Sequence, residues 1–135
     1  MNSLFPDICS DVLQESKKFY MSLFDFSPVF EIEWYIQLQS PTDKNLQLAF
    51  VKRDHPSVPE AYRQTPQGVV ISIELVNVDP VYKKACKLGY KMVVPLRDEV
   101  WGQRHFMTVD PNGLLVDVIQ MIEPSPQFLQ EHGLM

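Results

Sequence analysis

The chain has 135 residues, of which 45% are hydrophobic and 21% charged, as expected for one globular domain with a substantial core. The formal net charge is -5 without a cluster of lysine or arginine, which argues against nucleic acid as a partner. No apolar run is long enough for a transmembrane helix, and Pro6, Asp7 and Asp11 interrupt any signal peptide. We therefore expect a cytoplasmic protein that binds no membrane, with Cys9 and Cys86 as free thiols.

The first half of the chain predicts a strand, a helix and then further strands. Asp11 is the expected helix N-cap, and the apolar residues after it recur at helical spacing. Residues 30–38 alternate between apolar and mostly polar side chains, which predicts one half-buried strand with Trp34 on its buried side. The expected buried helical stripe is Val12, Leu13, Ser16, Phe19, Tyr20 and Leu23. The other expected elements are a strand over 4–10, a hairpin loop over 40–45 and a returning strand over 46–51.

The second half predicts the same order again, after a segment rich in proline and polar residues. Asp79 is the expected N-cap of a second helix, with Pro80 at its first position, and Gly89 is typical of a helix end. The expected buried side of this helix is Val81, Ala85 and Leu88, and the expected strands are 68–76, 91–96, 104–109 and 114–122. We thus predict one domain in which repeat one covers 1–52, a linker 53–67, repeat two 68–122 and a tail 123–135. The tail is either a short final helix or irregular.

The most informative segment is the predicted hairpin that runs from Trp101 to Asp117. Asp110-Pro111-Asn112-Gly113 has the residues that a type I turn prefers. Asp117 is an acid inside an apolar strand, so its carboxylate is either paired or used for function. Weak similarity between the repeats places Gln47 of the first at the position of Asp117 in the second.

These features resemble the vicinal oxygen chelate superfamily, which includes glyoxalase I, bleomycin-resistance proteins and extradiol dioxygenases. The resemblance rests on Ser16 to Tyr20 before Leu23-Phe24, on Glu99-Val-Trp101-Gly102, and on the Asp110 turn followed by an apolar strand with an acid. It implies an α+β fold of two βαβββ repeats, whose curled mixed sheets enclose a cavity that is completed in a dimer.

The resemblance also implies four ligand positions for a divalent ion in the metal-dependent members. They fall here near Phe5, Gln47 and Val70, and on Asp117. Only the last supplies an anionic or imidazole donor, whereas a divalent ion requires three or four such donors. We therefore expect no metal and no cofactor.

Several other residues are candidate ligand contacts in the hairpin and the first repeat. Trp101 is either a loop plug or an aromatic wall, and Arg104 is either a turn-bracing cation or a ligand clamp. His105 faces away from Arg104 and has no evident partner. Phe50 and Gln47 fall on opposite faces of one strand, and we favour Gln47.

The leading hypothesis is a dimeric, metal-free protein that binds a small organic ligand, antibiotic-like or aromatic, in an apolar cavity. The expected contacts are Trp34, Gln47, Phe50, Trp101, Arg104 and Asp117. One alternative is a lyase or isomerase of the glyoxalase type with a divergent active site, which could use Asp117 as a base. Another is a protein whose own side chains fill the cavity and which acts through its surface.

Overall fold

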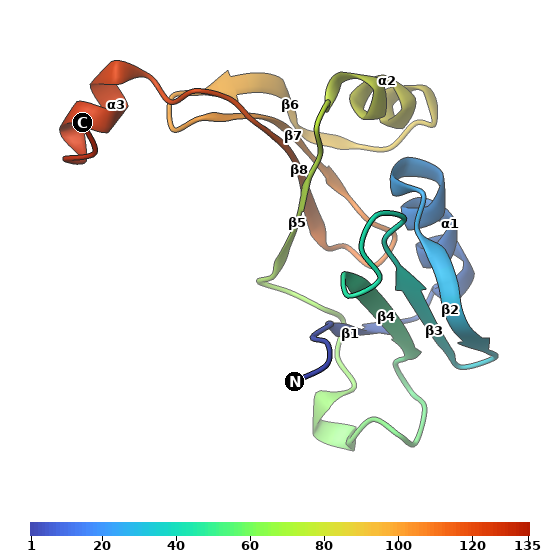
Figure 1. Ribbon diagram of the computed structural model, residues 1–135. Coiled ribbons are helices and arrows are strands. Elements are labelled where there is room, and N and C mark those ends of the chain that lie inside the picture. Colours follow the sequence, from blue (N-terminus) through green and yellow to red (C-terminus); the bar gives the residue numbers. More distant parts are fainter. The chain divides into compact units, whose positions relative to one another are not determined.

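The computed structural model describes residues 1–135 and consists of two compact units, each with a four-stranded mixed sheet (Figure 1). Unit 1 comprises Met1–Gly68 and Asp110–Leu114, and unit 2 comprises Val69–Val109 and Leu115–Met135. The segment 53–67 therefore belongs to unit 1. None of the helices combines the length and the apolar character needed to cross a membrane.

Unit 1 contains one strand, one helix and three more strands in chain order. They are β1 (Asp7–Ser10), α1 (Leu13–Phe24), β2 (Ser27–Ile32), β3 (Tyr35–Gln39) and β4 (Gln47–Lys52), followed by the 3-10 helix η1 (Glu60–Tyr62). The sheet order is β1-β4-β3-β2, with β1 parallel to β4 and the other neighbours antiparallel.

Unit 2 repeats this arrangement strand for strand. Its elements are β5 (Val70–Glu74), α2 (Asp79–Lys87), β6 (Met92–Glu99), β7 (Gln103–Val109), β8 (Leu115–Met121) and α3 (Pro126–Glu131). The sheet order is β5-β8-β7-β6, and again only the first pair is parallel. The predicted α+β class and the repeated βαβββ order are confirmed, and α3 shows that the tail contains a short helix.

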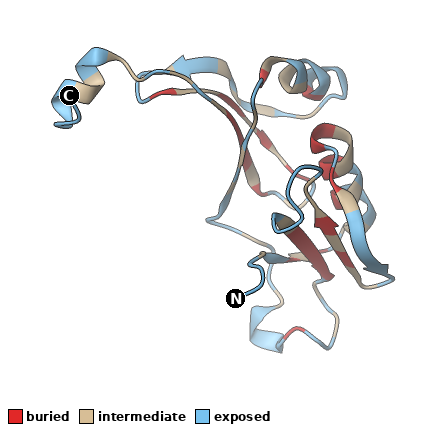
Figure 2. Cartoon of the chain, viewed as in Figure 1, coloured by how far each residue is buried: buried red, intermediate tan, exposed pale blue.

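The core of unit 1 lies between α1 and one face of its sheet (Figure 2). The helical stripe is buried as predicted from Ser16 to Leu23, and the rings of Tyr20 and Phe50 lie 5.5 Å apart. Because side chains alternate along a strand, Ala49 and Val51 point to the opposite face, which α1 does not cover and which we call the open face, although these two side chains are buried there.

In unit 2, α2 covers one face in the same way. The rings of Tyr82 and Phe106 are 5.1 Å apart, and the Val78 N–H donates to Gln120. The predicted burial of Leu88 is wrong, because this side chain is exposed beyond the last turn of α2.

The single strand predicted over 30–38 is two strands, because Glu33 and Trp34 form a tight turn between β2 and β3. Ile32 pairs with Tyr35 across this turn. The alternation of apolar residues continues through the turn, so the sequence gives no sign of the chain reversal. Trp34 therefore lies in a turn and not on the buried side of a strand.

Both predicted helix caps are also wrong. The α1 N-cap is Val12 and the α2 N-cap is Val78, and neither makes a side-chain cap. The carboxylates of both expected N-caps bind arginine side chains instead: Arg53 pairs with Asp11, and Arg104 pairs with Asp79. An ion pair thus replaces the hydrogen bond to the helix end at both positions.

The predicted turn after β7 is confirmed, since the Gly113 N–H donates to the Asp110 carbonyl. Residues 110–114 belong to unit 1, where Asp110 accepts a hydrogen bond from the Tyr20 hydroxyl at 2.8 Å. Asn112 is bonded there to Ser10 and Ser16. The turn residues therefore hold α1 as well as their own loop.

Gly102 has no room for a side chain. A Cβ atom there would lie 2.9 Å from both the Ile122 carbonyl oxygen and Pro124 Cγ, and φ is +103°. We expect Gly102→Ala to lower the free energy of unfolding by about 2–3 kcal/mol in urea denaturation. Gly89→Ala is the control, because φ is +80° with open space around it, and should cost about 1 kcal/mol. Equal losses of unfolding free energy in the two variants would contradict the close approach of Gly102 to Ile122 and Pro124.

Candidate functional site

A cavity of about 470 Å³ lies in unit 1. It is lined by Asp7, Phe30, Ile32, Trp34, Tyr35, Val51, Ser57 and Val58. Tyr35 pairs with Val51 and Ile32 pairs with Tyr35, so these strand residues share one face. This is the open face, because the adjacent residues Ile36 and Phe50 are fully buried on the α1 side.

Three aromatic side chains dominate the cavity wall. Phe30 is 53% exposed although it is large and apolar, and its ring lies 6.1 Å from that of Tyr35. The Trp34 ring stacks on His55 at 3.7 Å with an interplanar angle of 4°. His55 does not line the cavity, and its Nδ1 lies 2.8 Å from the Ser57 hydroxyl. His55 therefore holds the Trp34 ring by stacking.

Asp7 supplies the only charged side chain of this wall. Partial burial raises the pKa of its carboxyl above the ordinary value. No hydrogen bond or ion pair engages this carboxylate, whereas Arg53 pairs with Asp11 and Arg63 donates to the Val58 carbonyl. The Asp7 charge is thus available to a ligand.

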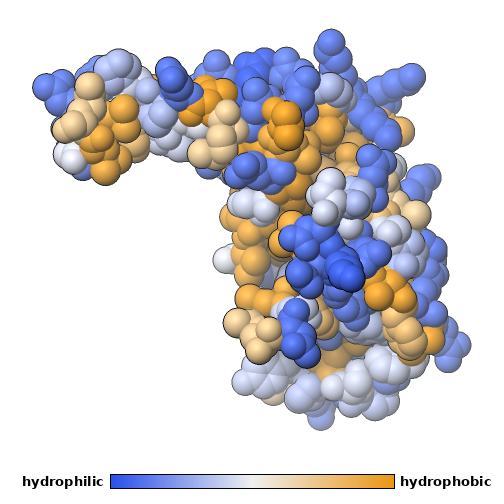
Figure 3. All heavy atoms as spheres, in the orientation of Figure 1, coloured by the Kyte–Doolittle hydropathy of each residue, from blue (hydrophilic) through white to orange (hydrophobic).

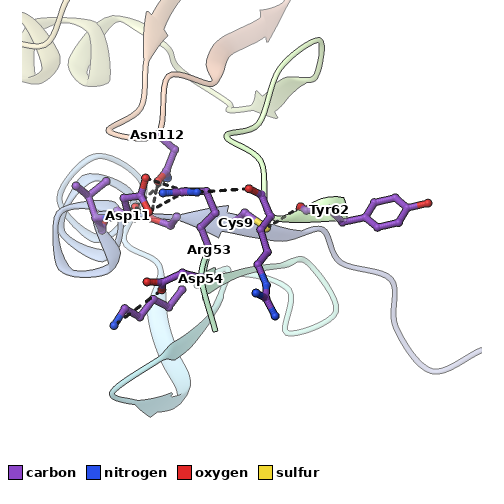
Figure 4. Close-up of polar contacts among 11 residues, drawn as sticks. Cys9, Asp11, Arg53, Asp54, Tyr62 and Asn112 are labelled. Carbon is purple, nitrogen blue, oxygen red and sulfur yellow. Dashed lines mark hydrogen bonds and ion pairs between the residues drawn. The ribbon is translucent and has the colours of Figure 1, made fainter. Parts of the chain in front are cut away.

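The proline-rich segment after β4 forms part of the cavity, because it provides Ser57 and Val58. Figure 4 shows how it is held: Arg53 Nε lies 3.0 Å from both carboxylate oxygens of Asp11, and its Nη1 donates to the Arg63 carbonyl. The Cys9 thiol contacts the Tyr62 carbonyl oxygen at 3.7 Å. These contacts make the segment a fixed wall of unit 1.

Of the predicted contacts in unit 1, only Trp34 lines this cavity. Gln47 lies on the open face, where its amide oxygen accepts from Gln37 and its amide nitrogen donates to the Lys44 carbonyl. Phe50 is fully buried on the opposite face, so it offers no surface to a ligand. The opposite orientations expected for Gln47 and Phe50 are confirmed.

In unit 2, His105 lies between two carboxylates. Its Nδ1 is 2.7 Å from Asp117 Oδ1 and its Nε2 is 2.8 Å from Glu99 Oε2. When both carboxyl groups are ionised, their oxygens only accept, so both ring nitrogens donate and the ring is the charged imidazolium. The expectation that His105 lacks a partner is wrong.

The surroundings of His105 have opposing effects on its pKa. Burial lowers the pKa, but the hydrogen bonds to Glu99 and Asp117 and their negative charges outweigh burial and raise it. Asp117 is buried on the face that α2 does not cover, because the adjacent residues Val116 and Val118 pack on the other side. Its carboxylate is therefore held by a neighbouring strand.

The other two predicted contacts in unit 2 are engaged by nearby side chains. Arg104 donates to both oxygens of Asp79, at 2.9 and 3.3 Å, and to Asp98 at 2.9 Å. Hydrogen bonding to Asp79, then to Asp98, raises the pKa of Arg104. Trp101 donates to Gln103 and lies edge-on to His105. Trp101 and Asp117 thus share the surroundings of His105, whereas Arg104 braces α2.

A sequence comparison with protein families matches residues 5–118 to the family model of the Glyoxalase/Bleomycin resistance protein/Dioxygenase superfamily. The chain belongs to this superfamily. Among curated proteins, none matches the chain.

Several solved structures share the fold of this chain. A glyoxalase/bleomycin resistance protein/dioxygenase from Nocardioides is 20% identical, with a TM-score of 0.70 over 93% of this chain and 87% of that chain. TnmS3, an antibiotic binding protein from Streptomyces sp. CB03234, is 17% identical, with a TM-score of 0.68 over 90% and 96%. A bleomycin resistance determinant encoded on the transposon Tn5 is 21% identical, with a TM-score of 0.61 over 90% and 98%.

The positions that the resemblance assigns to metal ligands, near Phe5, Gln47 and Val70 and on Asp117, do not fit a divalent ion. Phe5 and Val70 supply no donor, and both ends of the Gln47 amide are engaged within unit 1. Asp117 is held by His105. No group of three or more histidine, cysteine or acidic side chains in the structure is arranged to hold a metal ion. We therefore derive no chemistry through a metal.

Proposed function

We propose that this protein binds a small organic ligand, antibiotic-like or aromatic, without a metal and without transforming it. The observation that carries the proposal is the cavity of about 470 Å³ with Phe30, Trp34 and Tyr35 in its wall. Its volume lies within the usual range for small-molecule sites, and stacking on His55 orders Trp34 before a ligand arrives. A bleomycin resistance determinant and an antibiotic binding protein share the fold, which supports this assignment.

Calorimetry with bleomycin and a panel of planar aromatic compounds tests the proposal. At least one compound should bind the wild-type protein, and Trp34→Ala should weaken its binding by roughly tenfold or more. Tyr62→Ala is the matched control, because this aromatic side chain of unit 1 is exposed and does not line the cavity. The absence of binding across the panel, or equal affinity in Trp34→Ala, would overturn the cavity as the site.

We also propose that the protein is a cytoplasmic homodimer. Large apolar side chains on strands of unit 2 are exposed, among them Val70, Val93 and Met121. Figure 3 shows apolar residues on the molecular surface. Both cysteines are free, as a reducing compartment would leave them. Light scattering on the eluting protein should give twice the mass of 15.6 kDa, and the mass of one chain would refute the dimer.

The alternative of a glyoxalase-type lyase or isomerase with a divergent active site has one observation in its favour. His105 lies within hydrogen-bond distance of Glu99 and Asp117, an arrangement that can support proton transfer. This alternative requires conversion of a glutathione hemithioacetal by the wild-type protein and loss of conversion in His105→Asn. Our proposal expects no conversion by either protein.

A further inference from the structure

We propose that the ligand of the unit 1 cavity is a planar aromatic cation, with Asp7 as its anionic anchor. This inference rests on the proposed function and narrows the class of ligand. It follows from the charge of the cavity wall, the faces of its aromatic rings and its single unpaired acid.

The cavity carries one negative charge and no compensating positive charge. Asp7 lines it, and no lysine, arginine or histidine does. The two cations at the end of β4 and just after it already have other partners: Lys52 Nζ lies 4.0 Å from Asp54, and Arg53 pairs with Asp11 (Figure 4). A carboxylate in a cavity wall without a counter-ion favours a cationic partner over a neutral one.

The aromatic rings of the cavity wall also favour a positively charged ligand. The faces of aromatic rings are the negative ends of their quadrupoles, so they attract cations and disfavour anions. Phe30, Trp34 and Tyr35 contribute such rings to the wall that contains Asp7. The carboxylate and the rings therefore act together, and a flat cation can stack on a ring while its charge approaches Asp7.

The other residues of the cavity wall limit the number of polar groups that the ligand can have. Ile32, Val51 and Val58 are apolar, and Ser57 supplies the only aliphatic hydroxyl. Apart from Asp7, few polar groups are therefore available to bind a highly hydroxylated or multiply charged molecule. We expect recognition of a flat, mostly hydrocarbon skeleton with one positive charge.

Three probes of the same shape and different charge test this inference. They are 1-methylquinolinium, which is cationic, 1-methylnaphthalene, which is neutral, and 1-naphthoate, which is anionic. In calorimetry on the full chain, we expect 1-methylquinolinium to bind roughly tenfold more tightly than 1-methylnaphthalene, with 1-naphthoate the weakest. Asp7→Asn should remove the preference for the cation, so that 1-methylquinolinium and 1-methylnaphthalene bind with similar affinity.

Asp25→Asn is the matched control. Asp25 is an exposed acid of unit 1 with φ of 58°, a conformation that asparagine also tolerates. This variant should keep the wild-type preference for the cation, and thermal melts will confirm that both variants remain folded.

The outcomes separate this inference from the proposed function. Equal binding of the cationic and neutral probes, unchanged in Asp7→Asn, would overturn the cation preference and leave the cavity as a ligand site. If no probe binds while a compound of the earlier panel does, the inference also fails and the proposed function stands. If neither the probes nor the panel bind, both fail.

Discussion

Asp110→Ala is expected to lower the free energy of unfolding by about 3–5 kcal/mol, because this buried carboxylate satisfies several donors at once. Oδ1 accepts from the N–H groups of Asn112 and Leu114 at 2.8 and 3.0 Å, and Oδ2 accepts from the Tyr20 hydroxyl at 2.8 Å. The side chain is nearly inaccessible to water, so water cannot replace these bonds in the variant. Urea denaturation of both proteins measures the difference.

The control for this prediction is a double-mutant cycle with Tyr20→Phe. The Tyr20 hydroxyl donates only to Asp110, so its removal should cost about 1–2 kcal/mol in the wild-type background and much less beside Asp110→Ala. Strictly additive losses would show that this hydrogen bond does not contribute to stability.

His105→Gln is expected to lower the free energy of unfolding by about 1–3 kcal/mol at acidic pH, because Asp117 then loses its charged partner. In the folded protein the pKa of His105 is raised above its ordinary value of 6.5. A raised pKa means that the imidazolium stabilises the folded state. This contribution is fully present below pH 6.5 and is lost as the pH rises through the folded-state pKa.

The stabilities of wild type and His105→Gln should therefore converge as the pH rises. Denaturation curves from about pH 5.5 to about pH 9 measure the difference across the range in which a histidine titrates. His132→Gln, which changes an exposed histidine near the end of the chain, should follow the wild-type profile. A constant difference between wild type and His105→Gln would contradict the ion pairs with Glu99 and Asp117.

The order of elements could be predicted because each repeat carries strong local signals. The helical spacing from Ser16 to Leu23 indicates a buried face, and Gly89 and the Asp110 turn mark chain reversals by their backbone requirements. The Glu33-Trp34 turn has no such residue, so the alternation on both sides of it was indistinguishable from one long strand.

The predictions of Asp11 and Asp79 as helix N-caps are wrong for a different reason. Asp11 and Asp79 have the residue type and position of N-caps, but arginines distant in sequence bind their carboxylates. A local pattern cannot report a partner that is brought close only by the fold.

The candidate site was predicted only in part because it depends on strand register. His105 and Asp117 share a face of β7 and β8, and the confirmed turn sets their diagonal pairing, so this contact could have been derived from the hairpin. No comparable sequence pattern predicts the position of Asp7 in the cavity wall. Its place in a cavity with Phe30 and Trp34 follows from the β2–β3 turn, which the alternation concealed.

The central claim is that this member of the superfamily binds a ligand without metal chemistry. The most direct test is elemental analysis of the purified protein, combined with an assay of glutathione hemithioacetal conversion before and after addition of nickel, zinc or manganese. We predict less than stoichiometric metal and no conversion under any of these conditions, because the positions that the resemblance assigns to metal ligands fall near Phe5 and Val70, which supply no donor. Tightly held stoichiometric metal together with turnover would contradict this account.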